Sequence, residues 1–143
     1  MAKYRKWSHT TYDCRYHLVW ITKYRNKCLT DDMQKRLERI LRWVCDEWYI
    51  NILSIWMEED HVHMYICIPL SKPIPQVVQA LKWRSSRFLR KEFSWELRKW
   101  YWKPVLWADW YFIATVGEIN HDTIKNYVDM QGKEDVLWTE IEI

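Results

Sequence analysis

The residues best suited to chemistry are two histidines, His61 and His63, in the stretch DHVHMYICI at residues 60–68. Apolar and polar residues alternate along it, and this period of two is typical of a half-buried strand. Both imidazoles therefore leave the same face of the strand. Neutral imidazole is a common ligand for divalent metals, and a rigid strand holds two of them in place. The pattern indicates either part of a metal site or two polar residues on a solvated strand face, and two histidines alone rarely complete a metal site.

Composition restricts the class of protein. A chain of 143 residues with 49% hydrophobic and 29% charged residues fits a single globular domain, and two glycines and four prolines argue against long linkers. No apolar run approaches the roughly 18 residues that a membrane span needs. A net charge of +3 is too small to indicate a polyanionic partner by itself. The four cysteines have no C-x-x-C spacing, so we expect reduced thiols in a cytoplasmic protein.

Elements that could position the histidines follow from periodicity. The first helix begins after Thr30, a plausible cap, and ends at about Tyr49. The second is marked by apolar residues from Val77 to about Phe93. The order is β-α-β-β-α-β, which predicts an α+β, ferredoxin-like split βαβ fold with two helices on one face of an antiparallel sheet and the histidines on the other. The predicted strands lie at residues 15–22, 50–57, 61–68 and 110–116.

A further helix is predicted after the sheet is complete, at about residues 121–131, between Asn120 as its cap and Gly132 as its stop. Tyr127 and Gln131 are four residues apart, so they share one helix face. Tyr127 is either an amphipathic packing residue or a reactive group. We therefore predict one domain over residues 1–143, with a core at about 12–117, a tyrosine helix at about 120–131 and a short C-terminal tail.

In order and spacing, the chain resembles the single-tyrosine HUH transposases of small bacterial and archaeal insertion sequences. The resemblance covers about residues 12–131 and lies in YHLVWITKYR at 16–25, DHVH at 60–63, LKWRSSR at 81–87, YW at 101–102, LW at 106–107, YFIATVG at 111–117 and IKNYV at 124–128. The chain departs from the family pattern at Trp83 and Trp110, which stand where relatives tend to have glycine, and at Lys103-Pro104-Val105, which replaces a glycine-bearing turn.

The resemblance implies that His61, His63 and Gln131 bind Mg²⁺ or Mn²⁺ and that Tyr127 is the nucleophile. Tyr127 would form a covalent phosphotyrosine on the 5′-phosphate side of a cleaved strand. The implied substrate is single-stranded DNA with hairpins near the ends of the element, and the implied assembly is a homodimer. A two-fold dimer could place Tyr127 of one subunit over the histidines of the other, giving composite sites.

The residues expected to bind DNA lie on the second helix and on a basic loop. Phosphates could pair with Lys82, Arg84, Arg87 and Arg90 of the helix, while the loop offers Tyr24 and Arg25. Each cation could equally be a solvated surface charge.

Three classes of function remain at this point. The first is a metal-dependent transposase that nicks and joins single strands. The second is a hairpin DNA- or RNA-binding module of the same fold that does not cleave. It remains an alternative because Trp83 and Trp110 depart from the family pattern. A metal-carrier or regulatory domain of this fold is the third, but it leaves Tyr127 and the basic helix unexplained.

Overall fold

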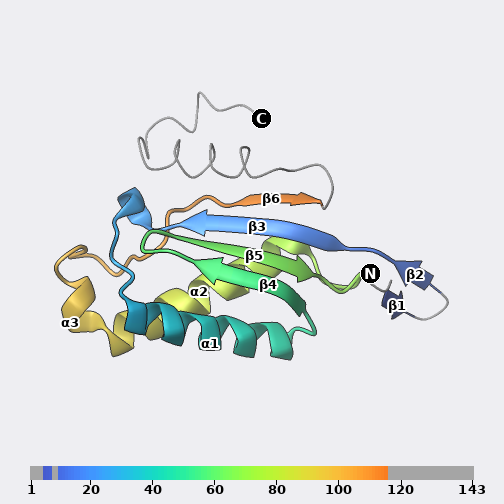
Figure 1. The fold of residues 1–143 in the computed structure, drawn as a ribbon, viewed down its shortest axis with the longest axis horizontal. Coiled ribbons are helices and arrows are strands. Elements are labelled where there is room, and N and C mark those ends of the chain that lie inside the picture. Colours follow the sequence, from blue (N-terminus) through green and yellow to red (C-terminus); the bar gives the residue numbers. More distant parts are fainter. Residues whose placement is uncertain (1–4, 8–9, 116–143) are drawn as a thin grey trace, which may run out of the picture.

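The computed structural model describes residues 5–7 and 10–115, and the predicted order of elements is confirmed. The tyrosine helix expected at residues 121–131, with Tyr127 and Gln131, lies outside the described residues. The split βαβ unit consists of β3 (Arg15–Ile21), α1 (Asp31–Glu47), β4 (Asn51–Met57), β5 (His61–Cys67), α2 (Ile74–Glu92) and β6 (Phe112–Thr115) (Figure 1). The structure adds the short strands β1 (Arg5–Trp7) and β2 (Thr10–Tyr12), the 3-10 turn η1 (Lys23–Arg25) and α3 (Ser94–Leu97).

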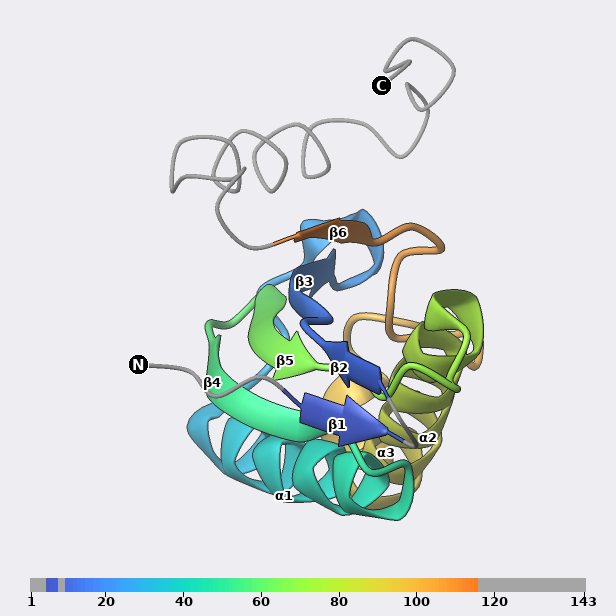
Figure 2. The ribbon, with the colours of Figure 1, turned by 90° about the vertical axis from the view of Figure 1, so that its right-hand side faces the viewer.

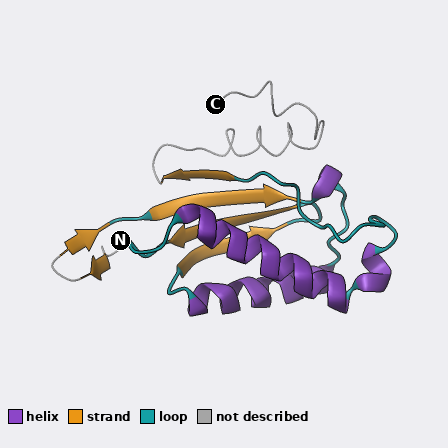
Figure 3. Ribbon diagram, turned by 180° about the vertical axis from the view of Figure 1, so that it is seen from behind, coloured by secondary structure: helices purple, strands orange, loops and turns teal. Residues whose placement is uncertain are grey.

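The main sheet has the strand order β4-β5-β3-β6, and every neighbouring pair is antiparallel. Helices α1 and α2 lie together on one side of this sheet (Figures 2 and 3). Because β3 and β5 are the two inner strands, each has a partner on both sides. The candidate histidines therefore lie on one of the two best-supported strands of the sheet.

The apolar core fills the space between the sheet and the two helices. Leu18 of β3 lies opposite Met64 of β5, and Trp20 lies opposite Val62. All four side chains are fully buried and pack with the apolar faces of α1 and α2. His61 and His63 alternate with these residues, so they lie on the sheet face away from the helices, as the sequence predicts.

Helix ends follow the local chemistry, with small differences from the predicted bounds: α1 ends at Glu47, two residues before the predicted end, and α2 begins earlier than predicted. The Thr30 hydroxyl accepts a hydrogen bond from the Met33 N–H at 3.3 Å, which confirms the predicted cap of α1. Helix α2 begins at Ile74, three residues before the first apolar residue used to place it. Pro75 belongs to the first turn, where proline is tolerated because its missing N–H would have no helical partner.

The aromatic stretch that follows α3 is tied to the end of β3. Trp107 packs edge-to-face on buried Trp20, with ring centroids 5.7 Å apart, and donates its indole N–H to Ser85 of α2 at 2.9 Å. Backbone bonds join Ala108 to Ile21 and Lys23 to Leu106. This stretch therefore supports the turn η1, which lies directly after β3 and near the histidines.

None of the helices within residues 5–7 and 10–115 combines the length and apolar character needed to cross a membrane. All four cysteines lie in this part of the chain, and none forms a disulfide bond.

Candidate functional site

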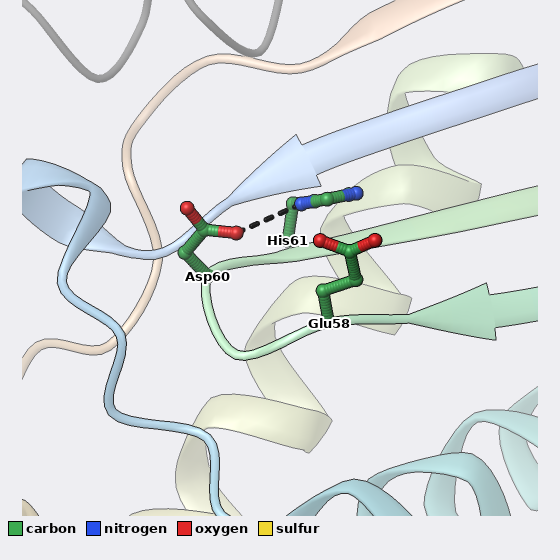
Figure 4. A group of neighbouring side chains, drawn as sticks. All are labelled: Glu58, Asp60 and His61. Carbon is green, nitrogen blue, oxygen red and sulfur yellow. Dashed lines mark hydrogen bonds and ion pairs between the residues drawn. The ribbon is translucent and has the colours of Figure 1, made fainter. Parts of the chain in front are cut away.

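The exposed end of the candidate site is built on the turn between β4 and β5. His61 follows Asp60 at the start of β5, and Glu58 follows the end of β4. The Glu58 N–H donates to the His61 carbonyl at 3.0 Å, which closes the turn. The three side chains gather at one end of the sheet (Figure 4).

His63 is not on an open solvated face, because its side chain is only 1% exposed. Trp56 of β4 lies opposite it, with ring centroids 3.6 Å apart. On β3, His17 places its Nδ1 3.1 Å from His63 Nε2 and stacks on Tyr65 with centroids 4.9 Å apart. One of these two nitrogens must donate a proton to the other. The interpretation of His63 as a solvated strand residue is therefore wrong.

His61 has a carboxylate partner. Its Nδ1 lies 2.9 Å from Asp60 Oδ1, and Arg25 donates from Nε to Asp60 Oδ2 at 2.8 Å. Burial alone would raise the pKa of Asp60, but the hydrogen bonds from His61 and Arg25 outweigh it and hold the pKa below its ordinary value. An ionised carboxylate only accepts, so Nδ1 of His61 carries the proton. In the neutral ring, Nε2 then has the free lone pair, and it points away from Asp60 (Figure 4).

Glu58, Asp60 and His61 together form a possible cation site. One potential ligand atom from each lies within 4.8 Å of the others. Carboxylate oxygens with imidazole nitrogen suit Mg²⁺ or Mn²⁺, so this donor set fits the implied metal. The metal ligands predicted from the sequence did not include Glu58 or Asp60. Their position in a tight turn directly before the histidines is the signal that could have identified them.

The predicted DNA-contacting loop is turn η1, and its two residues behave differently. Tyr24 is 61% exposed, whereas the Arg25 guanidinium is engaged by Asp60. Both residues have positive φ values, 60° and 54°, which are uncommon for residues other than glycine. Tyr101 holds the turn by donating its hydroxyl to the Lys23 carbonyl at 2.6 Å. Burial raises the pKa of Tyr101, which keeps that donor protonated.

The predicted cations of α2 do not form one surface. Arg84 pairs with Glu47 of α1, while Arg87 lies over the Trp83 ring. Lys82 and Arg90 line a groove of about 500 Å³ between α2 and residues 104–111. The Lys82 ammonium donates to the carbonyls of Ala108 at 2.6 Å and Trp110 at 3.3 Å. Arg90 donates to Ser86 Oγ at 3.0 Å.

Comparison with known proteins decides the family. The family described as "Transposase IS200 like" matches residues 10–131, most of the chain. The chain belongs to this IS200-like transposase family. Over its full length it is 29% identical to the transposase for insertion sequence element IS200 of Salmonella typhimurium, covering 93% of that protein. It is 31% identical to the ISDra2 transposase TnpA of Deinococcus radiodurans, over 84% of this chain and 85% of that protein.

Solved structures agree on the fold of this IS200-like transposase. A crystal structure of a candidate transposase from Deinococcus radiodurans R1 superposes with a TM-score of 0.82 at 31% identity, covering 89% of this chain and 97% of the other. A REP-associated tyrosine transposase, solved bound to a REP hairpin, has a TM-score of 0.57 at 12% identity, covering 90% of this chain and 69% of that one. Family membership supports the conclusion that this chain is a DNA-processing enzyme with a transposase function.

The two tryptophans that depart from the family pattern lie at the surface. Trp83 is 57% exposed and Trp110 is 49% exposed. Neither indole belongs to the core between the sheet and the helices. The fold therefore accommodates both without displacing apolar packing, and any effect they have falls on surface contacts.

The partly buried ammonium of Lys82 predicts that the stability of the folded state depends on pH. Burial lowers its pKa to about 8 from the ordinary 10.5. Between these values the unfolded chain binds more protons than the folded one, so Lys82 makes the folded state more stable as pH rises from about 8 toward 10.5. Relative to the parent, Lys82→Met should lose that rise, by at most about 1.4 kcal/mol per pH unit.

Urea denaturation at several pH values from 7.5 to 10 measures this effect. Lys91→Met, which removes an exposed lysine from the same helix, is the matched control and should follow the parent. Parallel stability curves for the parent and Lys82→Met would show that the Lys82 ammonium is not destabilised by burial.

Proposed function

We propose that this chain is a metal-dependent transposase that cleaves and rejoins single-stranded DNA at insertion-sequence ends through a covalent bond to Tyr127. The observation that supports this proposal best is the orientation of His61: Asp60 holds its Nδ1, so its Nε2 lone pair points away from Asp60. This arrangement occurs in a chain that belongs to the IS200-like transposase family. The four cysteines, none of them in a disulfide, fit action in the cytoplasm.

The proposed metal ligands are His61, His63 and Gln131, with Glu58 close enough to His61 to contribute. Mg²⁺ or Mn²⁺ fits these nitrogen and oxygen donors. When bound, the cation would offset negative charge on the phosphate and make phosphorus more susceptible to attack. Because His63 Nε2 lies 3.1 Å from His17 Nδ1, binding of the metal at Nε2 would require His63 to exchange this contact.

Tyr127 supplies the nucleophile in this proposal. Its hydroxyl has an ordinary pKa of about 10, so it must give up a proton as its oxygen attacks phosphorus. The new bond joins the tyrosine oxygen to phosphorus while the bond to the 3′ oxygen breaks, and that oxygen takes up a proton. The phosphodiester energy is kept in the phosphotyrosine. A 3′ hydroxyl can later attack it in reverse and join two strands without another energy source.

Hairpin-bearing single strands are the proposed substrate, by analogy with the relative that was solved on a REP hairpin. Arg87 is exposed beside Trp83, and Tyr24 is exposed on η1, so these side chains can reach phosphates and bases. Arg90 could contact a phosphate at the α2 groove. Lys82, Arg84 and Arg25 would have to exchange existing bonds to do so, and we expect smaller direct contributions to binding from them.

The proposed chemistry predicts a covalent adduct. Labelled single-stranded hairpin DNA incubated with the protein and Mn²⁺ should give an SDS-resistant complex. Tyr127→Phe removes only the hydroxyl, so the adduct should disappear while hairpin binding persists. His61→Ala or His63→Ala should reduce cleavage by at least about 100-fold, because charge stabilisation at a phosphate is usually worth several kcal/mol, and should change DNA binding only a few-fold.

Arg39→Ala, an exposed change on the outer face of α1, serves as the unaffected control. Hairpin binding without an adduct by the parent protein would favour the non-cleaving module. An adduct mapped by peptide analysis to Tyr111 or Tyr101 would contradict the assignment of Tyr127.

We further propose that the protein is a homodimer with composite sites, in which His61 and His63 of one subunit act with Tyr127 of the other. Mixing a His61→Ala, His63→Ala subunit with a Tyr127→Phe subunit tests this directly. Each is expected to be inactive alone, and the heterodimer should recover one intact site of two. Absence of recovery after verified subunit exchange would contradict the trans arrangement while leaving the chemistry intact.

A further inference from the structure

We propose that Arg25 and Asp60 are positioning residues, which fix the ring orientation and the proton of His61. The inference rests on the proposed function, because it treats His61 as a metal ligand. It also gives Arg25 a task different from the phosphate contact expected from the sequence.

Three side chains form a continuous chain of hydrogen bonds. Arg25 Nε donates to Asp60 Oδ2 at 2.8 Å, and the other oxygen of Asp60 lies 2.9 Å from His61 Nδ1. A carboxylate flanked by a guanidinium is the acceptor in both bonds. Each oxygen of Asp60 therefore has its own donor, and the carboxylate cannot rotate without breaking both contacts.

Burial of Asp60 and His61 favours the hydrogen bond between them over hydrogen bonds to water. The side chain of Asp60 is 7% exposed and that of His61 is 13% exposed, whereas Arg25 is 28% exposed at the outer end. Water therefore competes poorly for the Asp60–His61 bond. Because the proton is held on Nδ1, the lone pair is presented at Nε2, the nitrogen that points away from Asp60 (Figure 4).

The backbone of η1 is built to deliver Arg25 to this position. Tyr24 and Arg25 have consecutive positive φ values, which cost free energy for residues other than glycine. Several bonds hold this conformation, among them Arg25 N–H to the Thr22 carbonyl at 2.8 Å and Thr22 Oγ1 to the Asn26 carbonyl at 2.6 Å. The turn thus directs the guanidinium back toward the start of β5, where Asp60 lies.

Metal-ligating histidines commonly donate their second ring N–H to a carboxylate, and loss of that partner typically weakens metal binding about 10- to 100-fold. Arg25 is a cation and cannot be a ligand itself. An effect of Arg25 on metal affinity must therefore pass through Asp60. The position of the His61 proton separates this positioning role from the alternative in which Asp60 binds the metal directly, because only positioning requires the Nδ1 proton of His61 to be held by Asp60.

The first measurement is the position of the His61 proton, read by long-range ¹H–¹⁵N spectra of the metal-free full chain. The parent should show a protonated Nδ1 at His61. Asp60→Ala removes the acceptor, so the Nδ1 form should give way to a mixture of both tautomers. Glu59→Ala removes an exposed neighbouring carboxylate and should leave the parent signature unchanged. A His61 signature that is the same in the parent and Asp60→Ala would overturn the inference.

The second measurement is Mn²⁺ affinity, read from the electron paramagnetic resonance signal of free Mn²⁺. Arg25→Gln should weaken binding about 10-fold or more, and Arg25→Lys should restore part of the loss. Lys27→Gln removes an exposed charge two residues away and controls for net charge. Unchanged affinity in Arg25→Gln, with the fold verified by thermal denaturation, would overturn the role of Arg25.

Failure of the proposed function gives a different result. If the parent itself binds no Mn²⁺, the metal-dependent chemistry is contradicted. The tautomer difference between the parent and Asp60→Ala still decides whether Asp60 positions the His61 ring.

Discussion

The antiparallel pairing of β3 with β5 is the constraint on which the rest of the structure depends. Its register places Trp20 opposite Val62 and Leu18 opposite Met64 on the helix side of the sheet. A slip of one residue would turn these apolar side chains away from the helices and bring the histidines into the core. The same hydrophobic burial that holds α1 and α2 on the sheet therefore fixes His61 and His63 on its opposite face.

The opposite face is a network of partners rather than an open surface. His63 lies between Trp56 and His17, and His61 is linked through Asp60 to Arg25. These contacts restrict the orientation of both rings. Ordered imidazoles are what a metal site requires, since ligand geometry must be set before the ion arrives.

Sequence reasoning predicted the order of elements, the cap at Thr30 and the shared face of the histidines, because all depend on local periodicity or spacing. It missed β1 and β2, which at three residues each are too short to show a period. It also missed the contact of His17 with His63 and the pairing of Arg25 with Asp60, which join residues 46 and 35 positions apart. Such contacts follow from strand register and from the unusual backbone of η1, and neither is visible in composition. The roles of Tyr127 and Gln131 stay predictions.

The central claim is that the turn and strand around His61 hold a divalent cation. An anomalous difference map from a crystal of the full chain soaked in Mn²⁺ tests it most directly. We predict a peak within coordination distance of His61 Nε2, on the sheet face away from α1 and α2. Saturating Mn²⁺ with no peak at His61, or a peak bound only by residues elsewhere in the chain, would contradict it.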